Sequence, residues 1–317
     1  MPSSAVTKEW FLCSATSMAL FAVCIIMPAL SPVVLLICPF PQILLTYERG
    51  VPAGMLSAIA VACSIFLAFL AVPSVIYFIT FGLSGVLLGQ IARKSKGVDM
   101  LLGGIFCSLG CKLAAAYFLY KTTGLSLLAP DPSAIEQTLL SLVESRLAPL
   151  SGTGAIELRD NIAKNVRNVI MLIPFSLITF SSLEVFFSYV LSSKIHRSRS
   201  GDAFFTLPPF ARWSFPRNVV VALAVGLVCE FAARGRPGAY FLAQVSANLG
   251  MITWTLFAIQ GLSVAYYFME MHGFPKIIRV AIIVLTPIVQ LLGSIFSIVG
   301  IIDIGFDLRK RARRRQP

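Results

Sequence analysis

The feature that most constrains the fold is the confinement of polar residues to the gaps between long apolar runs. The chain of 317 residues is 57% hydrophobic and only 13% charged, with a mean hydropathy of +0.85. Soluble domains carry roughly 25% charged residues. The runs also lack the alternation that the strands of a membrane barrel would show. The sequence therefore predicts an all-α, polytopic bundle of transmembrane helices.

The apolar runs predict about nine or ten membrane segments. They lie at about 10–30, 32–47, 52–71, 74–92, 98–120, 166–192, 217–233, 239–270 and 278–306. The second run carries Pro39 and Pro41, so we expect a broken or re-entrant segment. Such a segment is tolerated only where protein or water covers the freed backbone groups.

The basic residues between the runs predict the orientation of the chain. With the N-terminus inside, the inside gaps hold most of them: Lys8, Arg49, Arg93, Lys94, Lys96, Lys194, Arg197, Arg199, Arg212 and Arg217. The last run has Lys276 and Arg279 at its start and Arg309 after it, so both of its ends favour the inside. A tight hairpin of two short crossings, with both termini inside, would reconcile them. One long tilted helix is the alternative.

The gaps also suggest a domain organisation. Residues 1–192 would form a six-segment membrane bundle, with a polar insertion at 121–165 on the outside. Within it, Asp131-Pro132 predicts the start of an amphipathic helix that lies on the membrane surface or covers a cavity mouth. An aromatic and basic linker at 193–216 suits the headgroup layer, and residues 217–317 hold the C-terminal membrane helices and a basic tail.

The net charge of +12 could indicate nucleic-acid binding or membrane topology. We assign it to topology and expect no nucleic-acid partner. The lipid bilayer, with its anionic headgroups, is the expected partner. The seven cysteines fall in or beside apolar runs and make no C-x-x-C pair, so no metal site or disulfide framework is expected.

No catalytic motif is recognisable. The two histidines, His196 and His272, lie in interfacial gaps, and no H-E-x-x-H motif, Walker loop or dinucleotide fingerprint is present in the sequence. We therefore expect neither enzyme activity nor a cofactor. Active transport would have to draw its energy from a partner or an ion gradient.

Lys112 and Glu184 lie well away from the ends of expected membrane segments, where charge is costly and usually functional. Lys112 shares a helix face with Ser108, and Glu184 shares one with Ser181 and Ser188. The expected depths of Lys112 and Glu184 differ by roughly 9 Å, most of which a long lysine could close. They would form either a structural pair or the wall of a pocket for a charged or zwitterionic ligand.

Further polar residues in the C-terminal runs have both structural and ligand-binding interpretations. Glu230 and Asn248 could line the same site, or could join neighbouring helices through hydrogen bonds. Asp303 and Asp307 precede the arginine cluster, so local ion pairing at the membrane interface is the simple explanation.

Several short stretches resemble a known family. They are Pro39-Phe40-Pro41, Tyr47-Glu48-Arg49-Gly50, Leu207-Pro208-Pro209-Phe210, Trp213, Pro216, Asn248, Gln260-Gly261-Leu262-Ser263-Val264, Gly300, Asp303 and Asp307-Leu308-Arg309. The pattern covers most of the chain and resembles the YybS-like family of bacterial integral membrane proteins, which is defined by a domain of unknown function. The resemblance implies a location in the bacterial cytoplasmic membrane.

The N-terminal part of that family is similar to the substrate-binding S-components of energy-coupling factor transporters. These have six membrane helices and dock on a coupling subunit with ATPases through a small-x-x-x-small face of the first helix. Ala15 and Ala19 match that face. S-components are usually near 200 residues, so the segments after 217 depart from the pattern. The resemblance implies a fold more than an activity.

Two functions therefore remain open. The first is a substrate-binding or transport subunit for a small molecule, with the insertion at 121–165 covering a cavity walled by Lys112 and Glu184. The second is a scaffold or regulator that does not transport, and that recruits a cytoplasmic partner or lipid through the segment 203–216 and the tail after Arg309.

Overall fold

Helices account for almost all of the chain in the computed structural model, which describes residues 4–314 except 70, 125, 129, 147–152, 237 and 287–289. Within these residues there is no strand, and seven helical segments are long and apolar enough to cross a membrane. The expected all-α, polytopic architecture is confirmed. The chain divides into two compact units, Met1–Leu207 and Pro208–Pro317.

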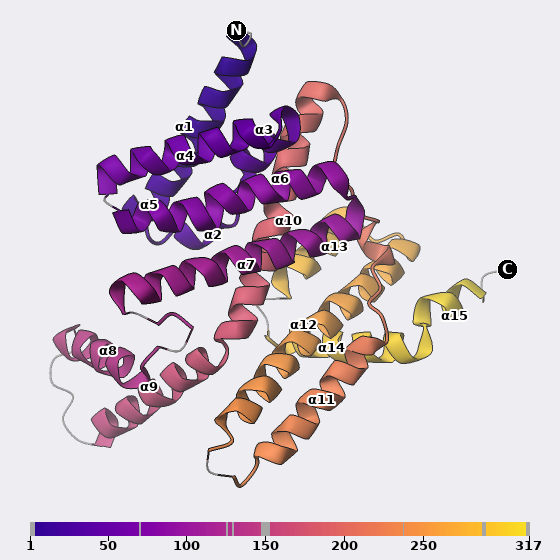
Figure 1. The fold of residues 1–317 in the computed structure, drawn as a ribbon. Coiled ribbons are helices and arrows are strands. Elements are labelled where there is room, and N and C mark those ends of the chain that lie inside the picture. Colours follow the sequence, from indigo (N-terminus) through magenta and orange to yellow (C-terminus); the bar gives the residue numbers. More distant parts are fainter. Residues whose placement is uncertain are drawn as a thin grey trace. The chain divides into compact units, whose positions relative to one another are not determined.

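The first unit contains six of the candidate membrane spans, formed by long apolar runs whose backbone groups must be paired within the helix. Its helices are α1 (Ser4–Ile26), α2 (Ser31–Leu35), α3 (Phe40–Arg49), α4 (Val51–Phe69), α5 (Ala71–Tyr77), α6 (Ser84–Lys94), α7 (Gly97–Thr123), α8 (Pro132–Arg146), α9 (Thr153–Met171) and α10 (Ile173–Ser200) (Figure 1). A π-helical segment, Phe78–Leu83, joins α5 to α6. Helix α10 packs against both α3 and α7.

The second membrane segment is broken at its prolines, as the sequence predicts. Helix α2 ends at Leu35 and α3 begins at Phe40, so the carbonyl group of Leu36 lies in the interruption. The hydroxyl group of Ser188, from α10, donates a hydrogen bond to this carbonyl oxygen at 3.0 Å. One turn further along α10, the hydroxyl group of Ser192 donates to the carbonyl oxygen of Phe40 at 3.1 Å. Protein side chains therefore cover the freed backbone.

We expect Ser188→Ala to destabilise the first unit by about 0.5–1 kcal/mol, because the carbonyl group of Leu36 would lose its donor in a site without water. Reversible denaturation in lipid–detergent micelles measures the change. Ser182→Ala is the matched control, because its hydroxyl group bonds only within α10, to the carbonyl oxygen of Ile178 at 2.7 Å. Equal effects of the two substitutions would contradict the assignment.

Helix α6 lies against α3 at close range because two glycines face it. A Cβ atom added at Gly85 would lie 2.9 Å from the carbonyl oxygen of Pro39, and one added at Gly89 would lie 2.8 Å from that of Ile43. Small residues four apart allow such contact between helix backbones. This G-x-x-x-G motif therefore serves internal packing of the first unit.

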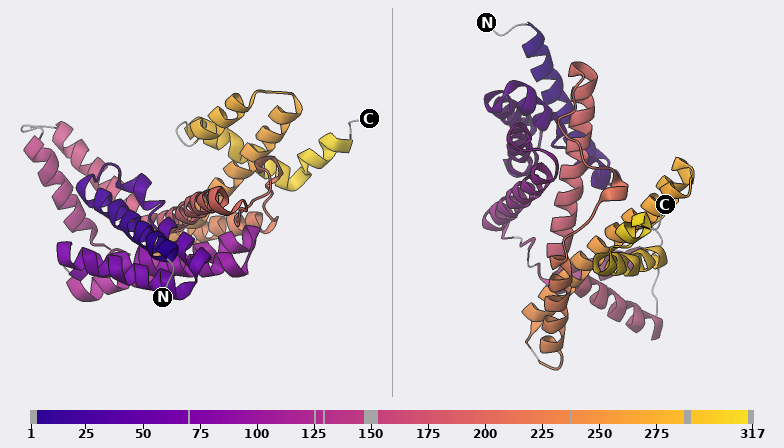
Figure 2. Two further views of the ribbon diagram at one scale, coloured as in Figure 1. Left: turned by 90° about the horizontal axis from the view of Figure 1, so that it is seen from above. Right: turned by 90° about the vertical axis from the view of Figure 1, so that its right-hand side faces the viewer.

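The insertion before α10 forms two helices that pack on each other, α8 and α9 (Figure 2). The predicted helix start is confirmed: Asp131 accepts hydrogen bonds from the backbone amide of Ser133 at 2.9 Å and from its hydroxyl group at 2.7 Å. These bonds hold the pKa of Asp131 below its usual range. Helix α9 differs from the expectation, since it begins at Thr153 whereas the sequence placed the sixth run at 166–192. Helix α9 is not predicted because its sequence is polar and the membrane segments are identified from apolar runs.

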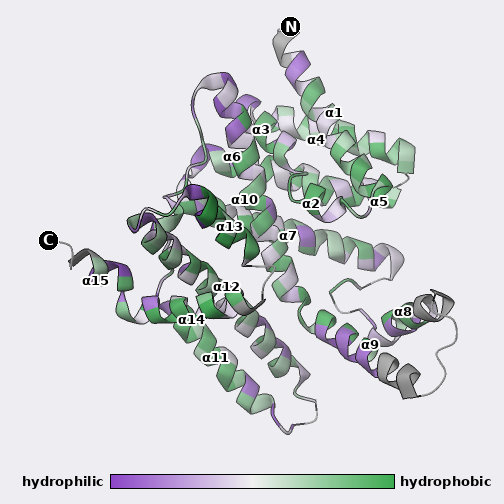
Figure 3. Ribbon diagram, turned by 180° about the vertical axis from the view of Figure 1, so that it is seen from behind, coloured by the Kyte–Doolittle hydropathy of each residue, from purple (hydrophilic) through white to green (hydrophobic). Residues whose placement is uncertain are grey.

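The second unit is also helical. Its helices are α11 (Asn218–Ala233), α12 (Tyr240–Met271), α13 (Lys276–Leu285), α14 (Gln290–Phe306) and α15 (Leu308–Arg314), preceded by a 3-10 turn at Phe210–Arg212. Figure 3 shows α11 and α14 as hydrophobic over most of their length. One long candidate span, α12, is the centre of this unit, and both α11 and α14 pack along it.

Helices α12 and α14 run parallel to each other. The hydroxyl group of Ser297 donates to the carbonyl oxygen of Trp254 at 3.0 Å, and further along both helices the amide of Gln260 donates to Asp303 at 2.6 Å. Between these bonds the backbones touch, because a Cβ atom added at Gly300 would lie only 2.0 Å from the carbonyl oxygen of Phe257. Glycine is required for so close an approach.

The parallel pairing explains why both ends of the last run carry positive charge. Arg279, in α13, pairs with Glu270 at the C-terminal end of α12 at 2.7 Å. Arg309, after α14, bonds to Ser263 near the same end at 3.2 Å. The start of α13 and the end of α14 therefore lie near the same end of α12, as the expected hairpin requires. Its turn falls in part on residues 287–289, which lie outside the described residues. The ten residues of α13 cover about 15 Å, half the hydrocarbon thickness.

The aromatic and basic segment at 193–216 is divided between the units. In the first unit Phe204 stacks on Tyr47 with ring centres 4.2 Å apart, and Phe205 is buried. In the second unit the stretch from Pro208 onward lies against α12, and the carbonyl oxygen of Phe210 accepts a hydrogen bond from Ser263 at 2.8 Å.

Candidate functional site

Lys112 and Glu184 form an ion pair near the middle of α7 and α10. The ammonium group of Lys112 bonds directly to Oε2 of Glu184. Ser108, one turn before Lys112, completes the cluster: its hydroxyl group donates to the same oxygen at 2.6 Å and accepts from Lys112 at 2.6 Å. The polar face of α7 that carries Ser108 and Lys112 therefore packs against the polar face of α10 that carries Glu184.

The cluster is sealed from the surface on the side of Glu184. The side chain of Glu184 is 0% exposed and that of Lys112 is 10% exposed. The ring of Phe180 lies below the ammonium group, 5.5 Å from Nζ. Ser108 and Ser181 are also fully buried. A carboxylate in such surroundings is stable only beside a cation and hydrogen-bond donors.

The site has unused hydrogen-bonding capacity. Oε1 of Glu184 and the hydroxyl group of Ser181 are buried, and neither has a partner among the described residues. The ammonium group of Lys112 has three N–H donors, and two are engaged by Ser108 and Glu184. An acceptor, a hydroxyl group and a donor are therefore available to a polar group that enters the site.

The ion pair lies close to the broken membrane segment. Ser188, one turn along α10 from Glu184, holds the carbonyl group of Leu36 in the interruption between α2 and α3. Ionisable side chains beside a discontinuous membrane helix are typical of transporter binding sites, where freed backbone groups and charges face the same substrate.

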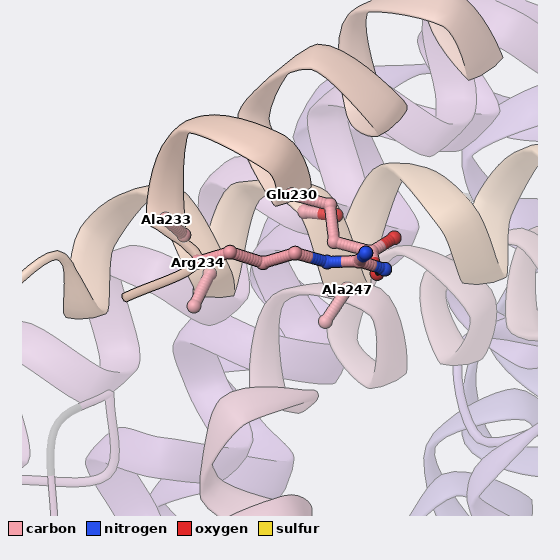
Figure 4. Close-up of a pocket in the computed structure, with 6 residues that line it drawn as sticks. Glu230, Ala233, Arg234 and Ala247 are labelled. Atoms are coloured by element: carbon pink, nitrogen blue, oxygen red, sulfur yellow. The ribbon is translucent and has the colours of Figure 1, made fainter. Parts of the chain in front are cut away.

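Two residues considered for the same site lie in the second unit. Glu230 pairs with Arg234 on α11 at 2.6 Å and lines a pocket of about 380 Å³ between α11 and α12 (Figure 4). Arg234 lines this pocket as well, and the remaining lining residues are small: Ala233, Ala243, Ser246 and Ala247. Asn248 is buried and donates to the carbonyl oxygen of Gln244 at 2.7 Å, a bond within α12.

Ala15 and Ala19, expected at a partner helix, both lie exposed on α1. Their role in docking stays a prediction.

A second buried polar cluster, which sequence reasoning missed, surrounds Arg309 in the second unit. Its guanidinium group donates to Oδ2 of Asp303 at 3.0 Å and to Ser263 at 3.2 Å. It also donates to the backbone carbonyl oxygens of Ala211 and Trp213, both at 2.9 Å. The expected local pairing of Asp303 with the arginine cluster is present, but Arg309 is buried instead of belonging to an exposed tail.

Gln260 extends the Arg309 cluster to the segment before α11. Its amide nitrogen donates to Asp303 at 2.6 Å, and its amide oxygen accepts from the backbone amide of Phe215 at 3.0 Å. Most residues of this cluster, namely Trp213, Gln260, Ser263, Asp303 and Arg309, fall in the stretches that carry the family resemblance. Those stretches, separated in sequence, are therefore joined in space and fasten the segment after Pro208 to α12 and α14.

The seven candidate spans among the described residues and the buried intramembrane ion pair define a polytopic helical membrane protein. The chain belongs to the family of predicted membrane proteins DUF2232, whose pattern matches residues 15–304. The uncharacterized protein YybS of Bacillus subtilis (strain 168) is 22% identical over 289 residues, which are 90% of this chain and 91% of that protein. No solved structure matches the chain.

The family membership expected from the sequence is therefore confirmed. The likeness to S-components stays a prediction.

Proposed function

We propose that this protein is a substrate-binding or transport subunit for a small polar molecule, which binds at Lys112 and Glu184 in the first unit. The observation that carries the proposal is the buried ion pair whose second carboxylate oxygen has no partner among the described residues. Burying an ionisable pair within the membrane costs desolvation free energy. Binding of a ligand to the groups that have no partner would explain why the pair is kept there.

The chemistry of the site defines the ligand class. Oε1 of Glu184 requires a hydrogen-bond donor, and the remaining N–H of Lys112 requires an acceptor. A zwitterion, or a neutral molecule with adjacent hydroxyl or amide groups, supplies both. Ser181, on the same face of α10 as Glu184, offers a hydroxyl group that can serve either way. The protein acts by binding and release and catalyses no reaction.

The energy for transport comes from outside the chain, because the sequence contains no Walker loop. We propose an ion gradient or a coupling subunit with ATPases as its source. The exposed face of α1 with Ala15 and Ala19 is suited to a helix of such a subunit. The basic residues favour a cytoplasmic membrane location with both termini in the cytoplasm.

Native mass spectrometry of the protein, released from its own membranes in lipid nanodiscs, tests the proposal. We expect the wild-type protein to carry a small-molecule adduct. The variant Lys112→Met/Glu184→Leu should lose it, because both charged groups are replaced by apolar ones of similar size while no unpaired charge is left behind.

The matched control is Lys121→Met, which removes a lysine near the end of the same helix, where its ammonium group lies 5.7 Å from the ring of Tyr117. This variant should keep the adduct. An adduct that survives in the double variant, or wild-type protein that carries none, contradicts the proposed site. Partner recruitment without any ligand would favour the scaffold function instead.

A further inference from the structure

Three exposed cations gather where α14 ends in the second unit. Arg217 and Lys310 both face Oδ2 of Asp307, at 3.9 Å and 3.0 Å, and their side chains are 76% and 73% exposed. The guanidinium group of Arg311 lies over the ring of Phe306, 5.3 Å from its centre. Three positive charges and one negative charge leave this surface with a net charge of +2.

The backbone at Asp307 fixes the start of α15, the helix that carries Lys310 and Arg311. Asp307 has φ +50°, and among the described residues it is the one residue other than glycine with a positive φ. Aspartate tolerates this left-handed conformation better than most residues do. The turn ends α14 at Phe306, starts α15 at Leu308 and directs Arg309 into its buried cluster. Lys310 and Arg311, which follow Arg309 in α15, therefore have a fixed support.

The position of the cations along α14 indicates what they bind. Ile302 and Phe306 are 42% and 56% exposed and belong to the apolar helix that precedes the charges. Such a boundary between apolar and cationic side chains occurs at the headgroup layer of a membrane. The half-buried Trp213, close to Arg309, is of the residue type that is enriched at that level.

We propose that Arg217, Lys310 and Arg311 form a binding site for the phosphate group of an anionic phospholipid. Guanidinium groups match the geometry of phosphate oxygens, and a lysine adds a compact charge. The acyl chains would lie along the exposed apolar side chains of α14. Asp307 limits the affinity, because its carboxylate competes with the phosphate for the same cations. The hydrogen bond from Lys310 lowers the pKa of Asp307, so the carboxyl group is ionised at neutral pH.

The test uses full-length protein in detergent micelles that contain phosphatidylglycerol or phosphatidylcholine, with bound lipid counted by native mass spectrometry. We expect the wild-type protein to bind one phosphatidylglycerol tightly and phosphatidylcholine at least tenfold more weakly. The variant Arg217→Gln/Lys310→Gln/Arg311→Gln should bind phosphatidylglycerol more weakly by at least about tenfold, since each surface cation contributes to attraction by anionic lipid. Asp307→Asn keeps the tolerance for positive φ, and should bind it more tightly.

The charge-matched control is Arg93→Gln/Lys94→Gln/Lys96→Gln in the first unit, which removes three cations and should leave the tight site unchanged. Equal losses in the two triple variants would overturn the proposal, and so would equal binding of the two lipids. Inorganic phosphate at millimolar concentration should not displace the lipid. Displacement by phosphate would assign the site to a free anion and overturn the commitment to a lipid.

Discussion

Replacing Lys112 with methionine is expected to lower the free energy of unfolding of the first unit by about 3–5 kcal/mol. The substitution leaves the carboxylate of Glu184 fully buried without its cation, and Ser108 alone cannot compensate for the lost charge. Tryptophan fluorescence during denaturation in mixed micelles can follow this unit separately. Trp10 is its one tryptophan, so the other two of the chain can be replaced by phenylalanine in the reporter background.

The double variant Lys112→Met/Glu184→Leu distinguishes an unpaired charge from a loss of packing. If the unpaired carboxylate causes the effect, the double variant should regain most of the lost stability, because a buried pair can often be replaced by apolar residues at little cost. A double variant as unstable as Lys112→Met would show that the lysine stem matters more than the charge. A stable Lys112→Met protein would contradict the buried pair altogether.

Replacing Arg309 with methionine is expected to destabilise the second unit by a similar amount, about 3–5 kcal/mol. Asp303 would be left buried without its cation, and the carbonyl groups of Ala211 and Trp213 would lose a donor. The segment that these carbonyls belong to should then detach from α12. In a Trp10→Phe background, denaturation followed by tryptophan fluorescence reports on this unit through Trp213 and Trp254.

Lys310→Met is the neighbouring control for the effect of Arg309. Lys310 is 73% exposed and its bond to Asp307 lies at the surface, so its removal should change stability by less than about 1 kcal/mol. Limited proteolysis adds a second measurement, because cleavage within 208–216 should accelerate in Arg309→Met alone. Equal stability and equal cleavage of the two variants would mean that Arg309 does not fasten this segment.

The sequence predicts those features that depend on local pattern. Hydrophobic runs of membrane length located the spans, and Pro39 with Pro41 located the interruption between α2 and α3. The pairing of Lys112 with Glu184 could also be anticipated, because each lies on a polar face of an otherwise apolar helix. Contact with lipid is unfavourable for such faces, so they pack against each other.

What the sequence does not predict depends on contacts between distant segments. Arg309 lies beside other arginines at the end of the chain, where an exposed basic tail is the ordinary expectation. Two of its acceptors, in Ala211 and Trp213, are backbone groups almost one hundred residues away. No side-chain pattern reveals a backbone acceptor, so the burial of Arg309 could be found only in three dimensions.

The parallel pairing of α12 with α14 has a consequence for biosynthesis. The face of α12 around Gly261 that receives α14 is made early, but α14 can align on it only after α13 and α14 have followed. Until Asp303 leaves the ribosome, Gln260 lacks this acceptor and must find another partner in the membrane. The second unit therefore closes only after α14 has been synthesised. A nascent chain cut short before α14 presents an uncovered helix face that carries Gln260 and Gly261.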